Sequence, residues 1–72
     1  MFTVDFGVKF IEEYDDFDDE IEIIAKEAGC SVGGMGYGFG NIRDYDVDAR
    51  DLEHLVKFVE LLRATGIPTK GI

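Results

Sequence analysis

Carboxylates are the residues of this chain with the most evident chemistry, and they are concentrated in one stretch. Residues 12–22, EEYDDFDDEIE, hold eight acids and no base, and the chain of 72 residues carries a formal net charge of −9. Acids three or four positions apart on a helix lie about 5–6 Å from each other, a spacing of the kind that a row of phosphates offers. Such a chain is repelled by nucleic acids and anionic membranes and is attracted to basic protein surfaces. The stretch predicts a surface for a basic partner, and a solvated face that only confers solubility is the simpler alternative.

A second group of acids has the spacing of a calcium loop without its other requirements. Asp44, Asp46 and Asp48 match the first, third and fifth positions of such a loop, but Ala49 stands where glycine is needed and Leu55 where the bidentate glutamate is needed. A strand that leads into a helix cap explains these acids better, and no metal site is predicted.

Cys30 and His54 are the only cysteine and histidine, which limits both catalysis and compartment. A catalytic pair would need a third, orienting group and a cleft, which so short a chain can scarcely supply. A single cysteine excludes an internal disulfide and favours a reducing compartment, so we expect a cytoplasmic location. No apolar run is long enough to span a bilayer. The sequence predicts no enzyme, no catalytic residue and no cofactor.

Glycine occupies every second position from Gly34 to Gly40 in the segment GGMGYGFGN. Neither the dinucleotide fingerprint nor the Gly-Lys-Ser/Thr of a phosphate loop is present. The segment therefore predicts a strand with Met35, Tyr37 and Phe39 on one side and bare backbone on the other, entered through a bulge at Gly33 and Gly34. The bare side either makes room for the chain's own helices or lets a partner approach closely.

Two other strands and a first helix follow from periodicity. Residues 2–10 alternate apolar and polar side chains, which indicates a strand with one buried face. The next segment predicts a helix that begins with a cap at Asp15 or Asp16 and ends at Gly29. Residues 42–47 predict a further strand. The core positions of this helix are expected to be Phe17, Ile21, Ile24 and Ala28.

The last segment predicts a helix capped by Asp48 and ended by Gly66. A second stripe of His54, Phe58 and Leu61 lies beside its core face. The predicted core face comprises Leu52, Leu55, Val56, Val59 and Leu62.

The order of these elements predicts a single α+β domain over residues 1–72 with a β-α-β-β-α arrangement. Both helices would cover one face of a three-stranded antiparallel sheet, with the third strand between the other two. This is a ferredoxin-like arrangement without its last strand. The first strand would remain an edge unless the tail, residues 67–72, or another chain covers it, so a homodimer is one expectation.

Acids of the first helix and the segment before it form the predicted partner-binding surface, with Ile23 as an apolar anchor among them. The residues are Glu12, Glu13, Asp15, Asp16, Asp18, Asp19, Glu20, Glu22, Ile23 and Glu27.

Two resemblances extend this interpretation. The order of FTVDFGVKF, an acidic helix, GGMGYGFG and DLEHLVKFVELL resembles the YggL family of ribosome-associated bacterial proteins, which have a basic amino-terminal segment that is absent here. In size, acidity and compactness the chain is similar to small phage-encoded inhibitors, including anti-CRISPR proteins and other nucleic-acid mimics. The second resemblance implies a viral, non-catalytic inhibitor that presents acids to the basic nucleic-acid-binding site of a host defence complex. The first implies a cellular adaptor for a ribonucleoprotein such as the ribosome.

Overall fold

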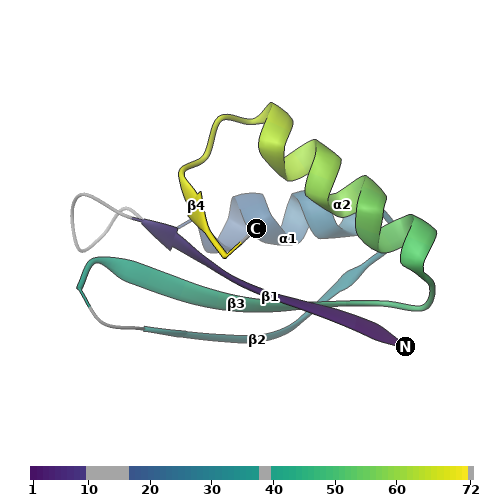
Figure 1. The fold of residues 1–72 in the computed structure, drawn as a ribbon, viewed down its shortest axis with the longest axis horizontal. Helices are drawn as coiled ribbons and strands as arrows, with labels where there is room; N and C mark the ends of the chain where they lie inside the picture. Colours follow the sequence, from purple (N-terminus) through teal and green to yellow (C-terminus); the bar gives the residue numbers. More distant parts are fainter. Residues whose placement is uncertain (10–16, 38–39, 72) are drawn as a thin grey trace.

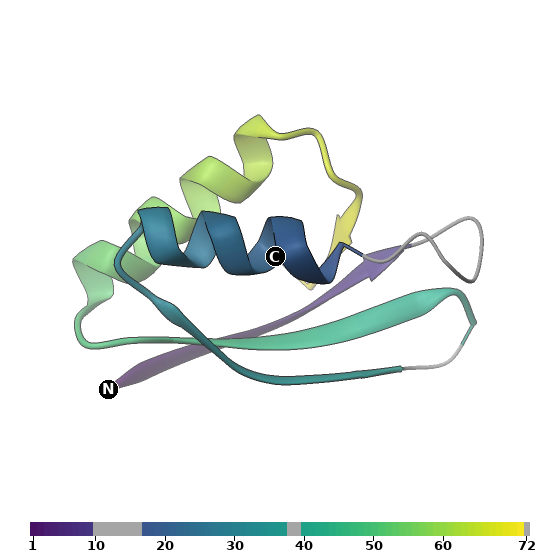
Figure 2. The same ribbon diagram turned by 180° about the vertical axis from the view of Figure 1, so that it is seen from behind.

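A computed structural model describes residues 1–9, 17–37 and 40–71. Its elements are β1 (Phe2–Lys9), α1 (Asp18–Glu27), β2 (Ser31–Tyr37), β3 (Ile42–Ala49), α2 (Leu52–Ala64) and β4 (Thr69–Lys70). Both helices cover one face of the sheet, which gives two layers (Figures 1 and 2). The predicted caps Asp15 and Asp16, and the predicted strand residues Phe10 and Phe39, lie outside the described residues.

The sheet has the order β2-β3-β1-β4, with antiparallel neighbours throughout. The position of β3 between β1 and β2 confirms the predicted topology. The prediction of three strands was wrong, because the tail adds a fourth. Lys70 pairs with Gly7 and Thr69 with Val8, and the Lys9 N–H donates to the Pro68 carbonyl at 3.1 Å. The chain leaves α2 through Gly66, whose φ is +77°, and the tail then pairs with the edge of β1 that would otherwise be open.

The core lies between the sheet and the two helices. Phe6 is its centre, with its ring centroid 5.6 Å from that of Tyr45 and 5.7 Å from that of Phe58. The alternation of β1 was therefore interpreted correctly for its middle, although Phe2, near the end of the sheet, is exposed. The buried apolar residues are Phe6, Val8, Ile21, Ile24, Ala25, Ala28, Tyr45, Val47, Ala49, Phe58 and Leu62.

Helix α1 has the predicted core face and the predicted end. Ile21, Ile24 and Ala28 are buried, and Phe17 packs against the core. Gly29 has a φ of +77°, and the Cys30 N–H donates to the Ala25 carbonyl at 2.7 Å, which completes a Schellman motif. The amino-terminal cap position is occupied by Phe17, which makes no side-chain cap.

Helix α2 differs from the prediction in its start and its face. Its cap is Asp51, which accepts from the His54 N–H at 2.9 Å; Asp48 instead belongs to β3. Phe58 is fully buried, whereas Leu52 and Val56 are 57% and 49% exposed. The predicted core positions Leu52 and Val56 were therefore wrong.

The physical reason is that apolar residues cover so much of α2 that periodicity alone does not fix its rotation. Packing decides the rotation instead. The large ring of Phe58 fits against Phe6, and Leu62 is buried with it, so the stripe predicted to be secondary holds a central core residue.

Candidate functional site

The outward face of α1 carries the described part of the predicted partner-binding surface. Asp19, Glu20, Glu22 and Glu27 are all exposed, and Ile23 is 57% exposed among them. The predicted residues Glu12, Glu13, Asp15 and Asp16 lie outside the described residues. We call the exposed group of Asp19, Glu20, Glu22, Ile23 and Glu27 the α1 face.

Ile23 is the centre of the α1 face. Residues three and four positions away on a helix are its surface neighbours, and for Ile23 these are Asp19, Glu20, Lys26 and Glu27. Three carboxylates and one ammonium group therefore surround an exposed apolar side chain.

Beside Ile23 the surface is hollowed into a shallow concavity of about 330 Å³. Its walls come from α1 and from the segment that follows α2, and they are largely apolar. The lining residues are Phe17, Glu20, Ile23, Ile24, Thr65 and Ile67. This arrangement provides a largely apolar concavity with one acid, Glu20, in its lining.

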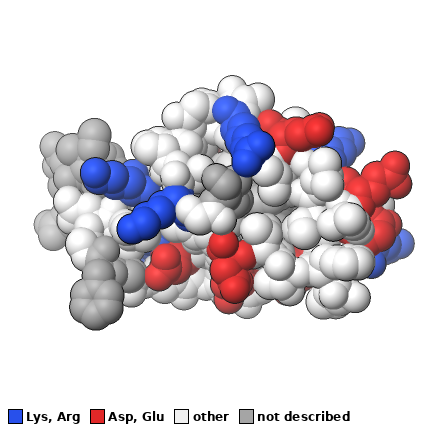
Figure 3. All heavy atoms as spheres, in the orientation of Figure 1, with Lys and Arg blue, Asp and Glu red and all other residues white. Residues whose placement is uncertain are grey.

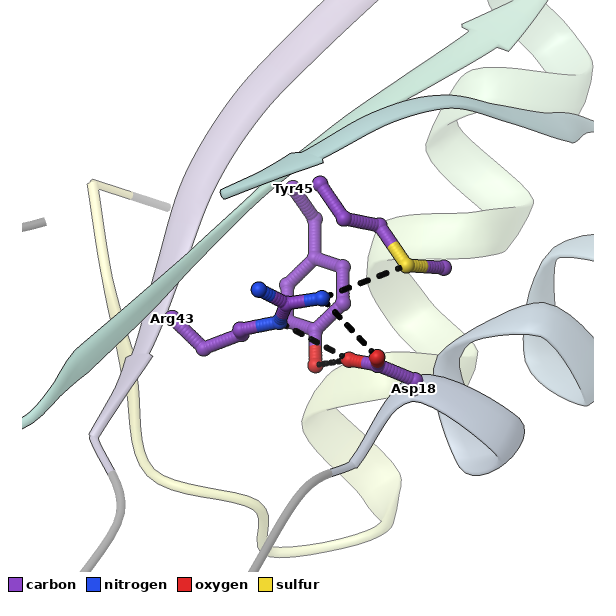
Figure 4. A network of polar contacts seen from close by, with 4 residues as sticks. Asp18, Arg43 and Tyr45 are labelled. Atoms are coloured by element: carbon purple, nitrogen blue, oxygen red, sulfur yellow. Dashed lines mark hydrogen bonds and ion pairs between the residues drawn. The ribbon is translucent and has the colours of Figure 1, made fainter. Parts of the chain in front are cut away.

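Asp18 was predicted to belong to the binding surface, and the structure places it elsewhere. Its carboxylate turns toward β3, where it accepts from Arg43 Nε at 3.1 Å and Nη2 at 3.0 Å and from the Tyr45 hydroxyl at 2.6 Å (Figure 4). Arg43 also lies 3.8 Å from the Met35 sulfur and 4.4 Å from the centre of the Tyr37 ring. Asp18 therefore joins α1 to the sheet through its contacts with Arg43 and Tyr45.

The pKa values in this network follow from the same contacts. Hydrogen bonds from the Arg43 guanidinium, and secondarily from Tyr45, lower the pKa of Asp18 against the opposing effect of burial. Burial, and then the hydrogen bond to Asp18, raise the pKa of Tyr45. The sequence contained a signal for this network. Arg43 and Tyr45 are two positions apart on β3, so their side chains lie on the same face, toward the helices. A partly buried guanidinium on that face needs an acid as its partner.

The opposite face of the sheet carries a second group of acids. Asp44, Asp46 and Asp48 alternate along β3 on the side away from the helices, and Asp5 of β1 lies directly opposite Asp46. A strand, and not a calcium loop, holds these acids, as the sequence indicated. We call the group of Asp5, Asp44, Asp46 and Asp48 the sheet acids.

The sheet acids are compensated unequally. Asp48 accepts from the Thr3 hydroxyl at 2.7 Å. Asp46 instead lies directly opposite the Asp5 carboxyl, and this neighbour, with the negative charges of Asp48 and Asp44, raises the pKa of Asp46. Like charges directly opposite on a sheet destabilise it, so Asp46 lies in a place that would favour a cation.

The glycines of β2 lie on this same acidic face. Gly34 is paired with Asp46 and Gly36 with Asp44, after the register shift between Val32 and Gly34 that confirms the predicted bulge. The interpretation that these glycines make room for the chain's own helices was wrong, because the helices cover the other face (Figure 2). A Cβ at Gly36 would meet none of the described atoms within 4 Å.

Cys30, His54 and Asp51 lie close together but do not form an activated nucleophile. The Cys30 thiol donates to the backbone carbonyl of His54 at 3.4 Å and not to its ring. The ring contacts the Asp51 carboxylate through Nδ1. Burial, with the charge of Asp51, raises the pKa of Cys30, and a raised pKa disfavours the thiolate that attacks substrates.

Metal and membrane sites are likewise not seen in the described ranges. Within residues 1–9, 17–37 and 40–71, no three His, Cys, Asp or Glu side chains are placed to hold a metal ion. No helix in the same part of the chain is long and apolar enough to cross a membrane. The face drawn in Figure 3 mixes acidic and basic side chains with uncharged surface.

No family model, no curated protein and no solved structure matches this chain.

Proposed function

We propose that this chain is a non-catalytic binding protein that inhibits a nucleic-acid-binding protein by placing its α1 face in the basic site of that protein. The observation that carries the proposal is the exposed Ile23 among Asp19, Glu20 and Glu27, beside an apolar concavity. The target class we propose is a host defence complex of the CRISPR type in the bacterial cytoplasm, because its nucleic acid is held in a positively charged channel.

The two chemistries of the α1 face have different tasks in this proposal. The carboxylates, within a chain of net charge −9, attract the partner over distance and raise the association rate. Ile23 and the concavity exclude water once contact is made, and such desolvated apolar anchors mainly slow dissociation. Nucleic acid and this chain would then compete for the same basic groups.

The test uses a purified CRISPR effector with its guide RNA, its target DNA, and purified ribosomes as the parallel target. Target-DNA binding is measured by mobility shift with increasing amounts of the chain, and association and dissociation rates by surface plasmon resonance at two salt concentrations. We expect the chain to displace target DNA from the effector. We also expect association to slow at higher salt, because the Debye length falls from about 10 Å at 0.1 M to about 3 Å at 1 M.

Two charge-matched variants separate the α1 face from net charge. Glu20→Lys with Glu27→Lys reverses two acids around Ile23, and Glu53→Lys with Glu60→Lys makes the same charge change on exposed positions of α2. We expect the first variant to lose inhibition and the second to retain most of it, while Ile23→Ala mainly accelerates dissociation. Equal losses in both charge variants would mean that only net charge matters. Binding to ribosomes without displacement of target DNA would replace the inhibitor with the ribonucleoprotein adaptor.

A further inference from the structure

Strand β2 forms an outer edge of the sheet. Its neighbour is β3 on one side, and in the part of the chain that the structure describes no further strand pairs with the other side. Edge strands usually carry charges or proline that prevent added strands from pairing. Here the segment from Ala28 to Ile42 contains no charged residue and no proline. Its bulge lies between Val32 and Gly34, and the pairing from Gly34 onward is regular.

Beside this edge, on the face of the sheet away from the helices, the backbone of β2 is not covered by side chains at its glycines. Gly34 and Gly36 present no side chains, and they lie between the edge and the carboxylates of Asp46 and Asp44. A strand added to β2 would lie two strand spacings, about 10 Å, from β3. A side chain of the added strand must reach over the glycine backbone of β2 to contact an aspartate of β3. Lys and Arg have long aliphatic stems that can span most of this distance, and the aspartate side chains span the rest.

We call the surface over Gly34 and Gly36, which carries no side chains, the glycine lane. The charges around the glycine lane favour a basic peptide over a second copy of the chain as its occupant. The bases on the open face, Lys9 and Lys70, belong to β1 and β4 on the far side of β3. Next to β2 the open face presents Asp44 and Asp46, and the Asp46 carboxyl is already crowded by that of Asp5. Two chains of net charge −9 would repel each other along this edge.

We propose that the outer edge of β2 binds an extended peptide segment as an added strand, with Lys or Arg at every second position reaching over Gly34 and Gly36 to Asp46 and Asp44. Main-chain hydrogen bonds supply the affinity of such strand addition, and the alternating side chains supply its specificity. This site lies on the layer opposite the α1 face and does not depend on the function proposed for that face.

The experiment titrates isotope-labelled protein with two synthetic peptides and follows backbone amide signals by NMR and affinity by calorimetry. One peptide alternates Lys with Val or Thr; the other has the same composition with its lysines in one block. The alternating peptide should shift and protect the β2 amides, those of Gly34 and Gly36 included. It should bind about tenfold more tightly than the block peptide, because only the alternating spacing lets its lysines reach Asp46 and Asp44 at the same time.

Two variants and a charge-matched control locate the site. Gly36→Val fills the glycine lane at a position where a Cβ meets no described atom, so the fold should persist while binding of the alternating peptide falls about tenfold. Asp44→Asn with Asp46→Asn should weaken it similarly, whereas Glu53→Gln with Glu60→Gln, an equal charge change on α2, should alter it less than about twofold. Gly36→Ala serves if the valine variant loses its dispersed NMR spectrum.

The proposal is overturned if folded wild type binds neither peptide, or binds both equally without β2 shifts, which would indicate charge attraction alone. It is also overturned if β2 amides become protected on raising the protein concentration alone, with a doubled mass in light scattering. In that case a second copy is the occupant.

Discussion

The α1 face and the sheet acids are built from the same residue types on opposite layers of the molecule, and their surroundings give them different properties. On α1 the carboxylates point outward around Ile23. On the sheet, strand pairing places Asp5 and Asp46 directly opposite each other, whereas on the helix the acids lie three or four positions apart on an outward surface.

Asp18 belongs to α1 but has the surroundings of neither group. One position before the exposed Asp19, it accepts from Arg43 and Tyr45. Asp18 is therefore expected to stabilise the fold, the outward acids of α1 to be nearly neutral for stability, and Asp46 to destabilise it. The sign of each effect depends on the neighbouring group and not on the carboxylate itself.

The largest effect is expected from a change in the core, which holds the α1 face and the sheet acids in place. Phe58→Ala empties a fully buried position against Phe6 and should cost about 3–5 kcal/mol of unfolding free energy, enough to leave little folded protein in so small a domain. Val56→Ala, on the exposed side of the same helix, is the matched control and should cost less than about 1 kcal/mol. Urea denaturation followed by circular dichroism measures both. Equal losses would show that α2 is rotated differently.

A smaller loss is expected from Asp18→Asn, which removes the charge that Arg43 and Tyr45 contact. Charge-assisted hydrogen bonds of this kind contribute about 1.5–3 kcal/mol. Because the pKa of Asp18 is lowered in the folded state, its contribution is complete above the unfolded value of about 4 and is lost as the pH falls through the folded value. The difference in unfolding free energy between wild type and variant should therefore shrink below about pH 4.

Asp19→Asn is the control for that prediction, since Asp19 lies on the same turn and is exposed. It should change stability by less than about 0.5 kcal/mol at neutral pH. A loss equal to that of Asp18→Asn would contradict the distinction between inward and outward acids of α1.

The smallest expected effect has the opposite sign. The pKa of Asp46 is raised in the folded state, so ionised Asp46 opposes folding, and Asp46→Asn should raise the melting temperature at pH 7. The gain should disappear as the pH falls below the pKa of Asp46, where its carboxyl is protonated. Differential scanning calorimetry across pH, with Glu60→Gln as the control, measures this. A lowered melting temperature at pH 7 would mean that Asp46 is compensated by a group other than the sheet acids.

Much of the fold could be predicted from local patterns. The alternation of β1, the core stripe of α1, the glycine at position 29 and the bulge near Gly33 each depend on residues close in sequence. Hydrophobic periodicity and backbone preferences act between residues close in sequence, so the sequence alone is enough to predict these features. The acidity of the surface, and the exposed Ile23 within it, were predictable for the same reason.

Tertiary structure decided what depends on contacts between distant segments. The rotation of α2 was fixed by the fit of Phe58 to Phe6, and the fourth strand by the edge of β1 that the tail could reach. Asp18 became structural because β3 brings Arg43 and Tyr45 to it, and Gly34 and Gly36 became an open lane because the helices cover the other face. The order of residue types fixes which positions carry charge or lack a side chain. Only packing determined what each of them faces, because burial and pairing are properties of the assembled layers.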